Sequence, residues 1–103
     1  MKNFRTFDLA VKFYQETQKL TLTNNFKDQL DRAASSIALN LAEGSGRNTL
    51  KDQRRFFSIA MGSLRECQAI LTLSGLENAE IAQTADILGA HLFKLIRNVI
   101  EAK

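Results

Sequence analysis

The stretch LKDQRRFFSIAMGSLRECQAILTLS, residues 50–74, decides the fold. It contains two rows of apolar or small side chains at seven-residue steps, which are Phe57, Leu64 and Leu71, and Ala60, Cys67 and Ser74. Seven-residue steps put both rows on one face of an α-helix, and this pattern is typical of helices that pack nearly parallel to each other. Thr49, with Asp52 three residues later, is expected to cap the start of this helix, and Gly75 is expected to end it.

Residues 26–43 are expected to form a second helix with the same periodicity. Its rows are Phe26, Ala33 and Asn40, and Leu30, Ile37 and Gly44. Asn25 can cap its first turn, with Asp28 three residues later in a capping-box arrangement. Gly44 is expected to be its left-handed C-terminal cap, because glycine adopts a positive φ without a steric penalty.

Two more helices are expected towards the ends of the chain. Residues 7–20 carry apolar side chains at three- and four-residue spacings, and Thr6 is expected to be their N-terminal cap. Residues 77–102 carry two further seven-residue rows, which are Ile81, Leu88 and Leu95, and Ala85, Leu92 and Val99. Four helices joined by short connections favour antiparallel neighbours. The expected fold is therefore all-α, an antiparallel up-down-up-down four-helix bundle.

Composition favours the same architecture. The 103 residues include no proline, the residue that interrupts helices most strongly. This length suits one hydrophobic core, so residues 1–103 are expected to form a single four-helix-bundle domain. The N-terminus lacks the apolar run of a secretory signal, and no window approaches the roughly 18–20 apolar residues of a membrane span. We therefore expect a cytoplasmic protein without a membrane segment.

One cysteine and one histidine offer little for catalysis or metal binding. Cys67 lies in an apolar row and is expected to be a small core residue, where a nucleophile would lack access to a substrate. No Glu-x-x-His pair accompanies His91, which argues against a di-metal carboxylate bundle. The sequence predicts that the protein is not an enzyme and has no metal, cofactor or small-molecule substrate.

Positive charge is concentrated in one part of the chain. Residues 47–65 carry five basic residues and one acidic residue, a net +4, whereas residues 66–91 carry −4 and the whole chain only +3. The basic residues are Arg47, Lys51, Arg54, Arg55 and Arg65. A basic strip beside two glycines, Gly44 and Gly46, at a helix N-terminus can contact the phosphates of a nucleic acid. The alternative is a solvated helix face with internal salt bridges.

A polar cluster is expected beside this strip, formed by Ser36, Asn40, Glu43, Ser63 and Glu66. Asn40 stands in a row where an apolar residue is expected, so the cluster could line a buried polar pocket at one end of the bundle. The structural alternative is that Asn40 and Glu43 satisfy backbone groups of the 44–49 turn and pair with a nearby arginine, because buried polar groups need hydrogen-bond partners. This structural interpretation is favoured.

Gly62 lies inside a predicted helix, where a glycine lowers the helix stability by about 1 kcal/mol relative to alanine. Small residues around it and in residues 33–38 suggest that the second and third helices approach closely there. A packing site for another subunit would explain the glycine equally well.

Four motifs follow one another between residues 29 and 66: Gln-Leu-x-Arg-Ala from Gln29, Ser-Ile-x-x-Asn-x-Ala-Glu-Gly from Ser36, Gly-Arg at Gly46, and Arg-Phe-x-x-Ile-Ala-x-Gly-Ser-x-x-Glu from Arg55. In this order they resemble the four-helix-bundle family of 23S rRNA-intervening-sequence proteins, also labelled S23 ribosomal proteins. Residues 4–20 look like the first helix of that family, although Phe13 stands where a tryptophan is often found.

The resemblance implies a binding protein rather than an enzyme. Members of the family are encoded in insertions within bacterial 23S rRNA genes and elsewhere in bacterial genomes, and the family has no established catalytic residues. A related branch, the accessory variability protein of diversity-generating retroelements, is a pentameric barrel whose basic surface binds nucleic acid. By this likeness we expect a homo-oligomer, with a pentamer favoured, and an RNA or ribonucleoprotein partner. The alternative is a protein-interaction scaffold that forms a homo-oligomeric ring without nucleic-acid binding.

Overall fold

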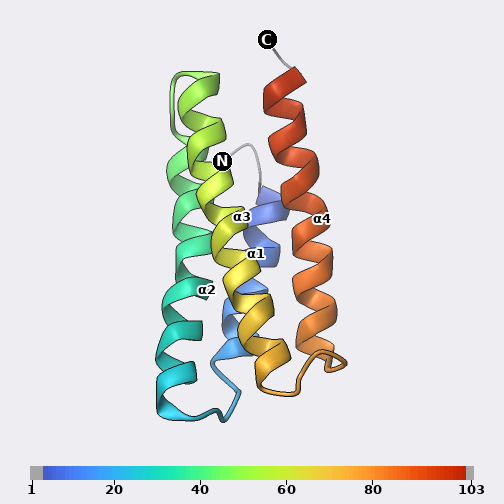
Figure 1. Ribbon diagram of the computed structural model, residues 1–103. Helices are drawn as coiled ribbons and strands as arrows, with labels where there is room; N and C mark the ends of the chain where they lie inside the picture. The colour runs from blue at the N-terminus through green and yellow to red at the C-terminus, as the bar shows by residue number, and fades with distance from the viewer. Residues whose placement is uncertain (1–3, 102–103) are drawn as a thin grey trace.

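The structure, a computed structural model, describes residues 4–101 and contains four α-helices (Figure 1). They are α1 (Phe4–Thr17), α2 (Asn24–Ser45), α3 (Leu50–Leu73) and α4 (Glu80–Glu101). No strand occurs within residues 4–101, so the predicted all-α fold of four helices is confirmed. Figure 1 shows consecutive helices joined at alternate ends of an elongated molecule, which measures 43 × 21 × 19 Å. Each helix packs against two others, in the pairs α1–α2, α2–α3, α3–α4 and α1–α4, which is compatible with the up-down-up-down arrangement.

The seven-residue rows form the core, as the sequence predicts. In α3, Phe57, Leu64 and Leu71 are at most 1% exposed, and Ala60 and Cys67 are fully buried beside them. The matching rows of α2 and α4 contribute fully buried side chains, which are Leu30, Ile37, Leu88 and Leu92. Burying one such leucine, isoleucine or phenylalanine side chain stabilises the fold by roughly 1.5–3 kcal/mol relative to leaving it exposed.

The first helix begins and ends three residues earlier than the sequence pattern predicts, at Phe4 and Thr17. The predicted N-terminal cap at Thr6 is wrong, because Thr6 lies inside α1 and is buried. Thr17, in the last turn, is fully buried and donates its hydroxyl to the carbonyl oxygen of Tyr14 at 2.6 Å. Both threonines therefore serve the packing of α1 rather than its capping.

The ends of α2 also differ from the prediction. Its N-terminal cap is Thr23, which makes no side-chain capping bond, whereas Asn25 lies inside the helix and accepts a hydrogen bond from Gln29. Gly44 is not a left-handed cap: α2 continues through it to Ser45, and the C-terminal cap is Gly46 at a φ of −91°. Within residues 4–101, Gly75 alone has a positive φ.

The reason for Gly44 is a close approach to α3. A methyl group there would lie 2.7 Å from the Phe57 ring and 3.0 Å from the Phe56 Cβ, so only a glycine fits without movement. The sequence instead predicts a close approach of α2 and α3 at Gly62. That prediction is wrong, because Gly62 is exposed and no described atom lies within 4 Å of where its Cβ would be. Of these two glycines, only Gly44 thus lies at a close α2–α3 contact, at the end of the helical hairpin.

The ends of α3 follow the sequence closely. The Thr49 hydroxyl accepts a hydrogen bond from the Asp52 amide at 3.1 Å, which confirms the predicted cap. The helix ends at Leu73 and Ser74 is its C-terminal cap. Gly75 follows at a φ of +75°, and the amide of Leu76 donates to the carbonyl of Leu71 at 2.8 Å. This is the Schellman arrangement that a glycine in this position predicts. The last helix begins at Glu80, three residues later than expected.

Candidate nucleic-acid interface

Four of the five predicted basic residues gather where α2 passes into α3. Arg47 lies in the link between the helices, Lys51 in the first turn of α3, and Arg54 and Arg55 in its second turn. Arg54 is half-buried and the other three are exposed. The structure therefore places these four cations at one end of the α2–α3 hairpin.

Phe56 is the centre of this end of the hairpin. The guanidinium carbon of Arg55 lies 4.4 Å from the centroid of the Phe56 ring, and that of Arg47 lies 4.7 Å from the same centroid. Guanidinium groups at such distances are attracted to the face of an aromatic ring. We refer to Arg47, Phe56 and Arg55 as the arginine–phenylalanine group. Its ring is positioned by Gly44, because the missing side chain of Gly44 lets the Phe56 Cβ come close to α2.

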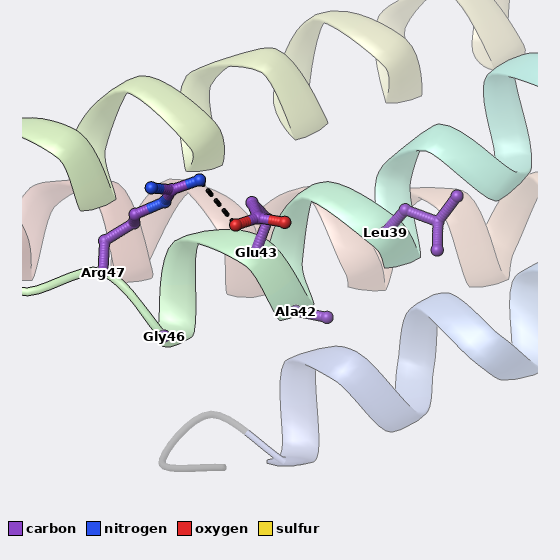
Figure 2. A pocket seen from close by; sticks show the side chains of 5 residues that line it. All are labelled: Leu39, Ala42, Glu43, Gly46 and Arg47. Carbon is purple, nitrogen blue, oxygen red and sulfur yellow. Dashed lines mark hydrogen bonds and ion pairs between the residues drawn. The ribbon is translucent and has the colours of Figure 1, made fainter.

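Arg47 has a second contact within the hairpin. Its Nη2 donates to Oε2 of Glu43, one turn back on α2, at 2.6 Å (Figure 2). The two side chains are 40% and 53% exposed, so water competes for this ion pair and it stabilises the fold little. With Leu39, Ala42 and Gly46, they line a shallow hollow on the outside of α2. The expected pairing of Glu43 with a nearby arginine is confirmed.

The other cations of this end are not neutralised. Lys51, Arg54 and Arg55 make no hydrogen bond or ion pair with any side chain that the structure describes. Lys51 precedes Arg54 and Arg55 by three and four residues, a spacing at which like charges repel on a helix. Lys51 also lies in the first turn, where the helix dipole disfavours a cation. Apart from the contact of Arg55 with the Phe56 ring, these three cations make no described contact that would stabilise the fold through their charge.

Arg65 lies apart from the other four. It is ten residues beyond Arg55, about 15 Å at the rise of an α-helix, and its Nη1 donates to Oε1 of Gln68 at 2.7 Å. The same nitrogen lies 3.9 Å from the place of a Cβ at Gly89 of α4, so Arg65 lies across the α3–α4 contact. Gln68 in turn donates to Asp86 of α4 at 3.2 Å. The predicted basic strip is thus one cluster of four cations and one separate arginine.

The predicted polar cluster also divides. Ser63 of α3 donates to the Ser36 hydroxyl of α2 at 2.9 Å, and the amide nitrogen of Asn40 lies 2.8 Å from the Ser36 carbonyl and 3.0 Å from its hydroxyl. Asn40 therefore satisfies groups at the middle of the α2–α3 contact, and the idea that it satisfies the 44–49 turn is wrong. Glu66 is exposed and has no hydrogen bond to any described residue.

The one cysteine, Cys67, and the one histidine, His91, form no metal site with other described residues. Cys67 is fully buried, and burial together with the nearby Glu66 charge raises the pKa of its thiol to about 12. His91 is half-buried on α4. Among the described residues, no three His, Cys, Asp or Glu side chains are grouped closely enough to hold a metal ion. No helix of residues 4–101 is long and apolar enough to cross a membrane.

The sequence comparison identifies the family. The model of the family described as 23S rRNA-intervening sequence protein matches residues 4–99, which span all four helices. The chain belongs to this family. No curated protein matches it. The resemblance carried by the motifs of residues 29–66 is thereby confirmed, and the whole arginine–phenylalanine group lies inside the matched range.

Phe56 is the residue of this site that the charge pattern alone misses. The signal that could have found it is an aromatic residue directly beside Arg55, in a segment that follows a Gly-x-Gly-Arg turn. Only the approach of α2 at Gly44 turns this neighbour into a platform for two guanidinium groups.

Proposed function

We propose that this 23S rRNA-intervening sequence protein is a non-enzymatic, cytoplasmic binding module for RNA or a ribonucleoprotein. Its phosphate contacts are Arg47, Lys51, Arg54 and Arg55, with Arg65 as an outlying contact on the α3–α4 side. The observation that supports this proposal is the set of three cations in the first two turns of α3, which form no ion pair with any described side chain although Lys51 repels both arginines. A polyanion relieves that repulsion by neutralising the cations, and the release of its counterions drives binding.

The experiment measures binding of a fluorescently labelled RNA hairpin by anisotropy between 50 and 300 mM salt. We expect the logarithm of the association constant to fall linearly with the logarithm of the salt concentration, by about 0.9 for each neutralised phosphate of a duplex. A variant that replaces Arg47, Lys51, Arg54 and Arg55 by glutamate should lose both the affinity and most of that slope.

The matched control reverses four other exposed cations, which are Arg5, Lys12, Lys19 and Lys94. It changes the net charge by the same amount but leaves the α2–α3 end intact, so it should keep most of the salt-dependent binding. Equal losses in the two variants would mean that net charge and not this surface attracts the RNA. A wild-type affinity without salt dependence would reject phosphate contact altogether.

The protein is proposed to act as a homo-oligomer, with a pentamer favoured. Exposed large apolar side chains on three helices are compatible with assembly, which would remove them from water: Leu39 is 68% exposed, Leu73 70% and Phe93 62%. Multi-angle light scattering of the purified protein tests this expectation, and a monomer at micromolar concentration would reject it.

The second candidate function is a protein-interaction scaffold that forms a ring without binding nucleic acid. It is favoured by the same exposed apolar side chains, which a purely phosphate-binding surface does not require. An oligomer by light scattering that fails to bind RNA at 50 mM salt would select this function over the first.

A further inference from the structure

We propose that Glu43 is an internal competitor for a phosphate: it holds Arg47 in the free protein and releases it when a phosphodiester group binds to Arg47 and Arg55. This inference rests on the proposed function and names the atoms that perform it. The arginine–phenylalanine group is then a two-guanidinium clamp, and Glu43 is the residue that keeps it partly closed.

The geometry of the clamp follows from its shared ring. Because Arg47 and Arg55 lie 4.7 and 4.4 Å from one ring centroid, their guanidinium carbons are no more than about 9 Å apart. A guanidinium group that faces a ring keeps the N–H bonds of its rim free, and these are the donors that match phosphate oxygens. The ring also restricts the rotamers of both side chains, so less conformational entropy is lost when they bind a ligand.

The ring itself cannot move easily. The Phe56 Cβ lies 3.0 Å from the place of a Cβ at Gly44, and its neighbour Phe57 is buried in the core. Two packed helices therefore hold the platform on which the two arginines lie. This is the difference between the clamp and an ordinary pair of surface arginines.

The Glu43 carboxylate already occupies one half of the clamp. Its Oε2 accepts a hydrogen bond from Arg47, as a phosphate oxygen would, whereas Arg55 has no ion-pair partner among the described side chains. Since both side chains of the Glu43–Arg47 pair are about half exposed, the pair is weak and a polyanion can displace the carboxylate. The guanidinium group of Arg55 can therefore bind a phosphate directly, whereas that of Arg47 must first lose its bond to Glu43.

The test compares Glu43→Gln with Asp31→Asn. Both changes remove one carboxylate charge from α2 and break an i,i+4 ion pair, of 2.6 Å between Glu43 and Arg47 and of 2.7 Å between Asp31 and Lys27. The probe is a fluorescein-labelled 15-nucleotide oligouridylate. We expect Glu43→Gln to bind about threefold tighter than the wild type, from the loss of a competing exposed ion pair, with a nearly unchanged salt slope because the same phosphate contacts form in both complexes. Asp31→Asn should not give this gain beyond the effect of its general change of charge. Equal gains in the two variants would overturn the inference.

The role of the ring is tested by Phe56→Leu, alone and together with Glu43→Gln. Leucine keeps an apolar side chain but removes the aromatic face, so the double variant should lose the threefold gain while its melting temperature stays near that of Phe56→Leu. A gain that persists without the ring would mean that Arg47 alone is responsible, and it would overturn the clamp.

A probe without RNA separates this inference from the proposed function. Inorganic tripolyphosphate is titrated while the side-chain N–H resonances of Arg47 and Arg55 are followed by NMR. Shifts of both residues, at lower concentration in Glu43→Gln, support the clamp even if the wild-type protein binds no RNA. If RNA binds but tripolyphosphate moves neither arginine, the clamp is rejected and the broader function stands. Tighter binding of polyglutamate than of oligouridylate would instead identify an acidic protein as the partner and reject the phosphate.

Discussion

Replacing Gly44 by alanine tests the packing that positions the candidate site. The added methyl group would lie 2.7 and 2.9 Å from two ring carbons of Phe57 and 3.0 Å from the Phe56 Cβ. The Phe57 ring is 1% exposed and a Cβ follows its backbone, so neither group can move aside cheaply. The helices must separate, and overpacking of this kind costs about 1–3 kcal/mol.

Gly62→Ala supplies the matched control. Gly62 also lies inside a helix, but it is exposed and a methyl group there would touch nothing within 4 Å. Alanine is preferred over glycine in a helix by about 1 kcal/mol, so Gly62→Ala should be stabilised, and Gly44→Ala should gain no more than the same amount. The difference between the two variants therefore isolates the steric cost, expected at about 1–3 kcal/mol in favour of Gly62→Ala.

The assay is urea unfolding followed by circular dichroism, with both variants at one protein concentration because assembly would raise the apparent stability. In thermal unfolding the same difference corresponds to roughly 4–8 °C per kcal/mol for a domain of this size. If Gly44→Ala is as stable as Gly62→Ala, α2 and α3 do not approach as closely as argued. The platform for Arg47 and Arg55 would then lack its support.

Three further predictions concern single side chains. Ser63→Ala removes the donor to the Ser36 hydroxyl and should lower the free energy of unfolding by about 1 kcal/mol, measured from the urea midpoint. Cys67 has its pKa raised from 9.0 to about 12, so the unfolded thiol ionises first; stability should fall by up to about 1.4 kcal/mol per pH unit above pH 9, and Cys67→Ala should lack this part of the slope. Lys51→Glu should raise the free energy of unfolding by about 0.3–1 kcal/mol at low salt, because a carboxylate in the first turn of α3 interacts favourably with the helix dipole. Unchanged or lower stability of Lys51→Glu would show that the lysine has a structural partner.

The sequence predicts the core well because the core depends on periodicity. Phe57, Leu64 and Leu71 recur every seven residues, and any helix that contains them has one apolar face whatever its partners are. The cap at Thr49 is predictable for the same reason, since its bond to the Asp52 amide closes within one turn. Both predictions succeed because the residues involved lie within the same helix or directly at its end.

The errors over Gly44 and Gly62 depend on residues that are distant in the sequence, unlike the misplaced helix ends. Gly44 looks like a helix end because glycine ends many helices, but its role depends on Phe57, thirteen residues later and on another helix. Gly62 looks like a contact point because it interrupts a helix, yet the surface that it faces in the described structure is empty. In both cases the sequence shows where a glycine lies, but only the tertiary structure shows what surrounds it.

The candidate site shows the same division between charge and geometry. Counting charges finds Arg47 and Arg55, but it places Arg65 with them, although Arg65 bonds to Gln68 and lies against α4. It also leaves out Phe56, which has no charge and yet contacts both arginines. A charge pattern predicts where a polyanion is attracted. Only the packing of α2 against α3 determines which guanidinium groups lie against the Phe56 ring.

The cations at the start of α3 can be weighed against the interpretation that they are an ordinary solvated face. Such a face usually gains stability from acid–base pairs at three- and four-residue spacings, as Lys27 and Asp31 do on α2. On α3 the same spacings join Lys51 to Arg54 and Arg55, which it repels, and Lys51 opposes the helix dipole as well. The one acid there, Asp52, lies three residues before Arg55 but forms no ion pair with it. Cations that repel one another and form no ion pair are better explained by a ligand that neutralises them. An anion bound across these residues does so, because it neutralises the mutual repulsion and meets the positive end of the helix at once.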